Sequence, residues 1–145
     1  MIHDASHFDW PTLTLSCVSE RTDTLLSVSA AIRHARDDLE RRGASVESVA
    51  ESDRLHFSWG WFTGRTWLGT IAGGSVQVNR DTDRILVTTK ASLWPLLAYS
   101  LIPILLLFIT DYSWFIGVGL LLFVTSHAVG TYIGLRGIAR AALTS

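Results

Sequence analysis

Electrical charge is almost missing from the last third of this 145-residue sequence. Residues 91–135 carry one formal charge, Asp111, whereas residues 1–90 hold twelve of the thirteen acids and all but two of the Lys and Arg residues. Water-exposed segments of this length normally carry many charges. The division therefore predicts a water-exposed part, residues 1–90, joined to a membrane part.

Cysteine and excess positive charge are also scarce. The single cysteine, Cys17, excludes an intramolecular disulfide, and its alternating apolar neighbours favour a small core residue. A net charge of −1 argues against nucleic acid as a partner, because such proteins usually carry an excess of Lys and Arg. The first ten residues, MIHDASHFDW, contain neither the basic nor the apolar region of a secretory signal, so we expect no cleaved leader.

Common catalytic motifs are missing as well. The sequence contains no P-loop, GxGxxG, GxSxG, HExxH or CxxC pattern. We therefore expect no cofactor and no resident metal, and we favour a protein that is not an enzyme.

Two long apolar runs fill the last third of the chain. Ala91–Thr110 provides 20 uncharged residues and Trp114–Leu135 provides 22 residues, each long enough to span the roughly 30 Å hydrocarbon core as a helix. Only three residues separate the two runs, which requires antiparallel neighbours. The sequence predicts a transmembrane hairpin over residues 91–135, followed by a short cytoplasmic tail over 136–145.

The orientation of this hairpin follows from its flanking residues. Basic residues lie on one side only: Arg80, Arg84 and Lys90 before the first span, Arg136 and Arg140 after the second. The positive-inside rule then places both termini in the cytoplasm and Asp111 outside, in a bacterial inner or plasma membrane. Aromatic residues suited to the two interfaces agree with this placement: Trp94 and Tyr132 inside, Tyr112, Trp114 and Phe115 outside.

Small residues recur every four positions on the second span. Ser126, Gly130 and Gly134 share one helix face, and such a row lets another helix approach closely. The approaching helix could be the first span of the same hairpin, a second copy of the chain, or part of a larger membrane complex.

His127 is the one strongly polar side chain within the second span, and Tyr99 and Ser100 lie at a similar depth on the first. A polar side chain in lipid needs a partner. His127 could be a proton-relay member or a haem or metal ligand. Alternatively, it is a neutral histidine that is hydrogen-bonded to Tyr99 or Ser100 and serves packing.

The residues before the hairpin predict a small two-layer α+β domain over 12–90, after a flexible tail over 1–11. Its elements are a strand, a helix and an antiparallel meander, with the apolar stripe of the helix packed on one sheet face. The expected strands are 12–19, 45–51, 54–62 and a hairpin of 75–80 with 84–90, and the expected helix is Asp23–Arg42. His3, Asp4, His7 and Asp9 could bind a metal, but a frayed tail is the favoured interpretation.

Aromatic residues are dense after the predicted helix. Phe57, Trp59, Trp61 and Trp67 lie within eleven residues, with Phe62 among them. They could build the core beneath the helix, or they could line a groove for a lipid or another apolar molecule.

Three functions fit these patterns. The first is a small membrane protein that serves as an accessory, scaffold or assembly subunit, with the bilayer and a membrane protein or a second copy as partners. The alternatives are a membrane-tethered module that binds a lipid or small apolar ligand, and a redox or proton-relay protein that uses His127.

Overall fold

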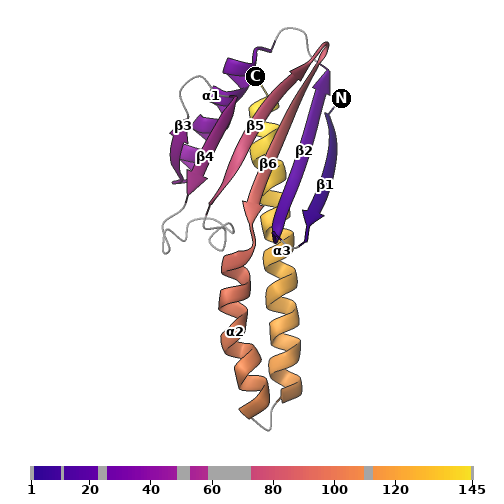
Figure 1. Ribbon diagram of the computed structural model, residues 1–145, viewed down its shortest axis with the longest axis vertical. Helices are drawn as coiled ribbons and strands as arrows, with labels where there is room; N and C mark the ends of the chain where they lie inside the picture. Colours follow the sequence, from indigo (N-terminus) through magenta and orange to yellow (C-terminus); the bar gives the residue numbers. More distant parts are fainter. Residues whose placement is uncertain are drawn as a thin grey trace.

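The computed structural model describes residues 2–10, 12–22, 26–48, 53–58, 73–109 and 113–144. These residues form a six-stranded antiparallel sheet and three helices, so the mixed α+β class is confirmed (Figure 1). The strands are β1 (Ile2–Asp9), β2 (Thr14–Thr22), β3 (Ser45–Ser48), β4 (Arg54–Ser58), β5 (Gly73–Asp81) and β6 (Arg84–Ser92). The helices are α1 (Val28–Arg41), α2 (Trp94–Ile109) and α3 (Ser113–Leu143).

The strand order is β1-β2-β6-β5-β4-β3, and every neighbouring pair is antiparallel. The last four strands form the expected meander, and the predicted hairpin turns at Thr82, whose φ of 42° is in the left-handed region. β2 then pairs with β6 along its whole length, so the N-terminal part of the chain lies beside the last strand.

Residues 2–9 form a strand, and the expected flexible tail over 1–11 is wrong for them. Ile2 pairs with Arg21 at one end of β1, and Asp9 pairs with Thr14 at the other. The register is unbroken between these pairs, so the main chain of β1 is held by β2 along its length. The polar side chains that suggested a tail reflect the position of β1 at the sheet edge.

The helix α1 begins later than expected. Ser27 is its N-cap and its Oγ accepts a hydrogen bond from the Ala30 N–H at 3.1 Å, which fixes the start at Val28 rather than near Asp23. Gly43, with φ of +84°, follows the helix at its C-terminal end. The buried stripe of Ala31, Ala35 and Leu39 confirms the amphipathic spacing.

The helix α3 does not end at Leu135 but continues to Leu143, so the expected tail over 136–145 is wrong for the residues described. Its last turns carry a stripe of fully buried residues at helical spacing: Leu135, Ile138, Ala139, Ala142 and Leu143. The stripe packs on β2, β6 and α1 (Figure 1). The Thr89 hydroxyl of β6 links the sheet to α3. Its Oγ1 lies 3.2 Å from the Cys17 carbonyl oxygen of β2 and 3.3 Å from the Leu135 carbonyl oxygen of α3.

One face of the sheet is therefore covered by α1 and the C-terminal part of α3. The core lies between this face and the two helices. Side chains alternate along each strand, so Ile85, Val87, Thr89 and Ala91 of β6 are buried under the helices. The opposite face carries mainly polar side chains and has no helix on it among the described elements.

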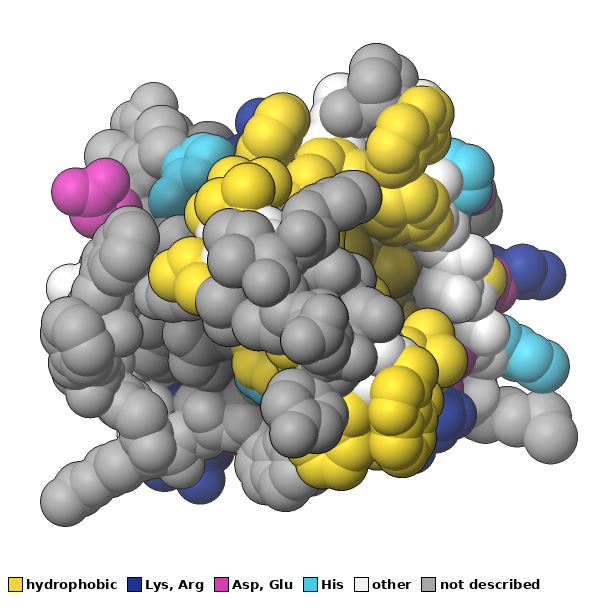
Figure 2. Space-filling model, turned by 90° about the horizontal axis from the view of Figure 1, so that it is seen from below, with side chains coloured by type: hydrophobic (Ala, Val, Ile, Leu, Met, Phe, Trp, Pro, Cys, Tyr) yellow, Lys and Arg dark blue, Asp and Glu magenta, His cyan; other side chains and the backbone are white. Residues whose placement is uncertain are grey.

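The helices α2 and α3 extend side by side from one end of the sheet, where β1 ends at Asp9 and β6 ends at Ser92 (Figure 1). Seen from their tips, hydrophobic side chains gather around this helix pair and charged ones lie at the periphery (Figure 2). We call this end of the sheet its helix-proximal end. Both chain termini lie toward the other end.

Among the described residues, one helix is long and apolar enough to cross a membrane, Trp114–Leu143, and only 11% of its most apolar stretch is buried. The apolar part of α2, Leu96–Leu105, is shorter. The expected first span of 91–110 starts too early, because Ala91 is a sheet residue that pairs with Leu15 and Gly74. No second helix of spanning length is shown in the described part of the chain.

Candidate functional site

His127 is bonded within its own helix. Its Nδ1 lies 2.8 Å from the Phe123 carbonyl oxygen, and its ring packs on the Phe123 ring at 4.1 Å between centroids. Because a carbonyl oxygen only accepts, this contact places the ring proton on Nδ1. The Nε2 atom is then the ring nitrogen that could bind a ligand.

The structure does not join His127 to the polar residues expected to satisfy it. The buried Ser100 hydroxyl donates to the Leu96 carbonyl oxygen at 2.8 Å, one turn earlier in α2. The side chain of Tyr99 lies outside the described residues. His127 and Ser100 are thus each bonded to a backbone carbonyl one turn earlier in their own helix.

The small-residue row on α3 is not one free face. Ser126 is exposed and its hydroxyl donates to the Phe123 carbonyl oxygen at 3.0 Å, whereas Gly130 is half-buried and Gly134 is buried. Only the Ser126 end of the row is open to another helix.

Phe57 belongs to the core and does not line a groove. It is 3% exposed and lies on the helix-facing side of β4. Gly74 on β5 makes room for it, because a Cβ at Gly74 would lie 2.6 Å from Phe57 Cζ. Trp59, Trp61, Phe62 and Trp67 lie outside the described residues.

The four N-terminal residues considered as possible metal ligands are divided between the two faces of the strand. Alternation places Asp4 on the helix-facing side of β1, and His3, His7 and Asp9 on the other side. Within the described ranges, no three His, Cys, Asp or Glu side chains gather as metal ligands would.

Asp4 instead forms a charged cluster that sequence patterns did not indicate. Its carboxylate, 6% exposed, accepts hydrogen bonds from Ser19 Oγ at 2.7 Å, Arg136 Nε at 2.6 Å and Arg140 Nη2 at 2.8 Å. Burial alone raises the pKa of the Asp4 carboxyl, but these three hydrogen bonds outweigh it and lower the pKa below its usual value. We call these four residues the Asp4 cluster.

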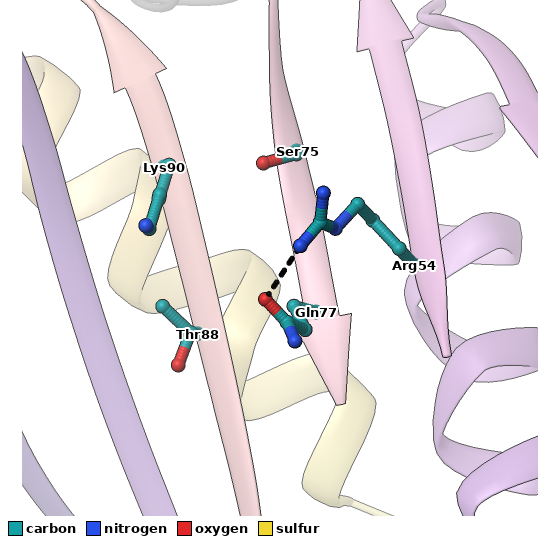
Figure 3. A pocket seen from close by; sticks show the side chains of 5 residues that line it. All are labelled: Arg54, Ser75, Gln77, Thr88 and Lys90. Carbon is teal, nitrogen blue, oxygen red and sulfur yellow. Dashed lines mark hydrogen bonds between the residues drawn. The ribbon is translucent and has the colours of Figure 1, made fainter. Parts of the chain in front are cut away.

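The open face of the sheet holds a small polar pocket of about 100 Å³ (Figure 3). Arg54 reaches from β4 to β5, where its Nη2 donates to Gln77 Oε1 at 3.2 Å, and Lys90 and Thr88 line the pocket from β6. Ser75 completes the lining. Two cations beside hydroxyl and amide groups can bind a small anion through charge and hydrogen bonds.

A larger groove lies where the sheet meets the helix pair. It has a volume of about 530 Å³ and an almost wholly apolar lining. β1 and β2 supply Phe8 and Leu15, α2 supplies Leu96, and α3 supplies Val124, Ala128 and Tyr132. We call it the junction groove. The groove could not be predicted from local patterns, because β1 and β2 are distant in the chain from α2 and α3.

No family model, curated protein or solved structure matches this chain. Its function is therefore inferred from the arrangement of its own residues.

Proposed function

We propose that this chain is a small integral membrane protein that serves as an accessory, scaffold or assembly subunit. In this proposal α2 and α3 cross the bilayer as a hairpin, and the sheet domain is held at the cytoplasmic surface. The observation that carries it is the outward exposure of the apolar side chains of both helices. Leu101, Ile102, Leu121 and Leu122 are each more than half exposed, which is costly in water and favourable in lipid.

Aromatic residues at both ends of the apolar surface support this placement. Trp10 and Trp94, 74% and 59% exposed, follow β1 and β6 at the helix-proximal end of the sheet, and Trp114 and Phe115 are exposed at the far end of α3. The helix advances about 27 Å from Trp114 to Tyr132 at 1.5 Å per residue. That length is close to the roughly 30 Å hydrocarbon core, whose interfaces favour Trp and Tyr.

The basic residues support the cytoplasmic side for the sheet domain. Lys90, Arg136 and Arg140 all belong to the sheet end of the helix pair. Labelling with a membrane-impermeant maleimide tests this orientation, with the buried Cys17 as the silent background. In intact cells we expect Asp111→Cys to react and Thr144→Cys to react only after permeabilisation. Reaction of both from the same side, or release of the chain by alkaline carbonate, would contradict the proposal.

The accessory role is supported by the open end of the small-residue row. Ser126 is exposed beside Thr125 and Val129 on the outward surface of α3, where another helix can approach. A photo-crosslinker at Ser126 should yield one product of defined mass, and Gly130→Leu should remove that product by blocking close approach. The matched control places the crosslinker at Leu101 on α2. Equal products from both positions, or none from Ser126, would argue against a specific partner.

The redox or proton-relay alternative rests on the Nε2 atom of His127. An absorption spectrum with a Soret band, or metal that co-purifies with the chain and is lost in His127→Ala, would support it. A colourless, metal-free protein would leave His127 with the packing role that its contact with Phe123 supports.

A further inference from the structure

The junction groove lies at the depth where the proposed bilayer would change from hydrocarbon to headgroups. Tyr132 lines it from α3, and Trp94 lies one residue from its Leu93 wall. The groove adjoins the outward apolar surface of α3 at Val129, which is itself half exposed. Hydrophobic side chains line a hollow beside the helix pair in the view from the helix tips (Figure 2).

The Asp4 cluster lies directly beyond the groove on the side of the sheet. Ser6 and Asp4 follow one another on the same side of β1, and Arg136 is one helical turn after Tyr132 on α3. Asp4 is one negative charge shared by two positive ones, so the cluster has a formal charge of +1. The side chains of Arg136 and Arg140 are 39% and 47% exposed, and their remaining N–H groups can reach another anion.

We propose that the junction groove binds one anionic phospholipid of the cytoplasmic leaflet, with an acyl chain against Leu96, Val124 and Ala128 and the headgroup phosphate at Arg136 and Arg140. The inference rests on the membrane placement proposed above. The volume of about 530 Å³ is within the range of pockets that hold small ligands. The positive charge of Arg136 and Arg140, on the sheet side of the groove, favours an anionic headgroup. Arg pairs well with phosphate, and a zwitterionic lipid brings no net negative charge to these residues.

The test uses the full chain in nanodiscs that contain phosphatidylglycerol and phosphatidylcholine in equal amounts, followed by native mass spectrometry. We expect one phosphatidylglycerol retained per chain. Ala128→Trp should abolish retention by filling the groove, whereas Leu122→Trp, on the outward lipid-facing surface, should leave it unchanged. Ser6→Trp narrows the same groove from β1 and provides the test if Ala128→Trp does not fold.

The charge test compares two arginines that are each paired with a carboxylate. Arg140→Gln should reduce the preference for phosphatidylglycerol about fivefold, the change expected when one basic side chain near an anionic headgroup is lost. Arg84→Gln should not change it, because Arg84 pairs with Glu20 at the other end of the sheet.

Several outcomes would overturn the proposal: equal retention of the two lipids, retention unaffected by groove filling, or a second copy of the chain in place of lipid. Carbonate extraction of the same membranes separates this result from the proposed function. A chain that resists extraction but shows no lipid preference contradicts only the lipid site, whereas a chain that is extracted contradicts the membrane placement itself.

Discussion

Replacing Asp4 by Asn removes the negative charge that joins the first strand to the last helix. The Asp4 side chain is nearly buried and accepts three hydrogen bonds, two of them from arginines. Asn keeps the size but carries no charge, so the bonds from Arg136 and Arg140 to Oδ2 of residue 4 lose their ionic character. Charged hydrogen bonds contribute about 1.5–3 kcal/mol each. Because both arginine ends reach water, we expect a total loss near the lower end, about 2 kcal/mol.

Thermal unfolding in a mild detergent, followed by the circular dichroism of the sheet, measures this loss. About 2 kcal/mol corresponds to a Tm lower by roughly 4–8 °C for a chain of this size. Asp9→Asn is the matched control, because Asp9 lies on the same strand and its described side-chain bond is a local one from Thr12 at 2.9 Å. It should shift the Tm by less than about 2 °C.

The effect of Asp4→Asn should also depend on pH. The folded pKa of Asp4 is lowered below its usual value, so its contribution to stability is fully present above about pH 4 and is lost as the pH falls through the folded pKa. The Tm values of the wild type and of Asp4→Asn should therefore converge in acid. Equal Tm values for the two proteins at pH 7, or a gap that does not narrow as the pH falls below about 4, would refute the role assigned to this carboxylate.

Three further predictions follow from packing and burial. Ile138→Ala, in the fully buried stripe of α3, should cost about 2–5 kcal/mol of unfolding free energy, whereas Ile133→Ala, at an outward position, should cost less than about 1 kcal/mol in the same melts. Gly74→Ala should prevent close pairing of β5 and β6, because its Cβ would collide with a main-chain oxygen; Gly119→Ala, with open space around it, should be neutral or slightly stabilising by circular dichroism. Burial, and to a smaller extent the negative charge of Asp4, raises the pKa of the Cys17 thiol. Maleimide at pH 7 should therefore label Cys17 only in denaturant, and rapid labelling of the folded chain would contradict its burial.

The sequence predicted the elements whose signals are local. The apolar stripe of α1 and the β5–β6 hairpin repeat at the spacings of a helix and a strand, and both are present. The end of α1 near Gly43 was also predictable, because a glycine there adopts a left-handed φ at no steric cost.

The features that could not be predicted depend on contacts between distant residues. β1 has no apolar alternation of its own. It is held as a strand by its pairing with β2 and by the bonds of Asp4 to arginines that lie 132 and 136 positions later in the chain. Arg136 and Arg140 marked the end of an apolar run in the sequence. They instead lie within a continuous helix, because Asp4 neutralises part of their charge and the apolar residues between them pack on the sheet.

The junction groove was hidden for the same reason. Its walls at Phe8, Leu15, Leu96 and Ala128 become neighbours only when the first strand, the second strand and both long helices have assembled. Phe57, the described member of the aromatic group, does not indicate the groove, because it is a core residue.

The Asp4–Arg140 contact also determines when the fold can be completed during synthesis, because it joins the first strand to the last helix. The two residues are 136 positions apart, and Leu135, Ile138 and Leu143 are part of the core beneath the sheet. A ribosome that has released only the first 92 residues has released all six described strands but not the long helix that covers them. The sheet must therefore wait, with one apolar side partly uncovered, until both long helices have been made. A fragment that ends at residue 92 lacks this covering helix, which makes it a poor substitute for the whole chain in any binding experiment.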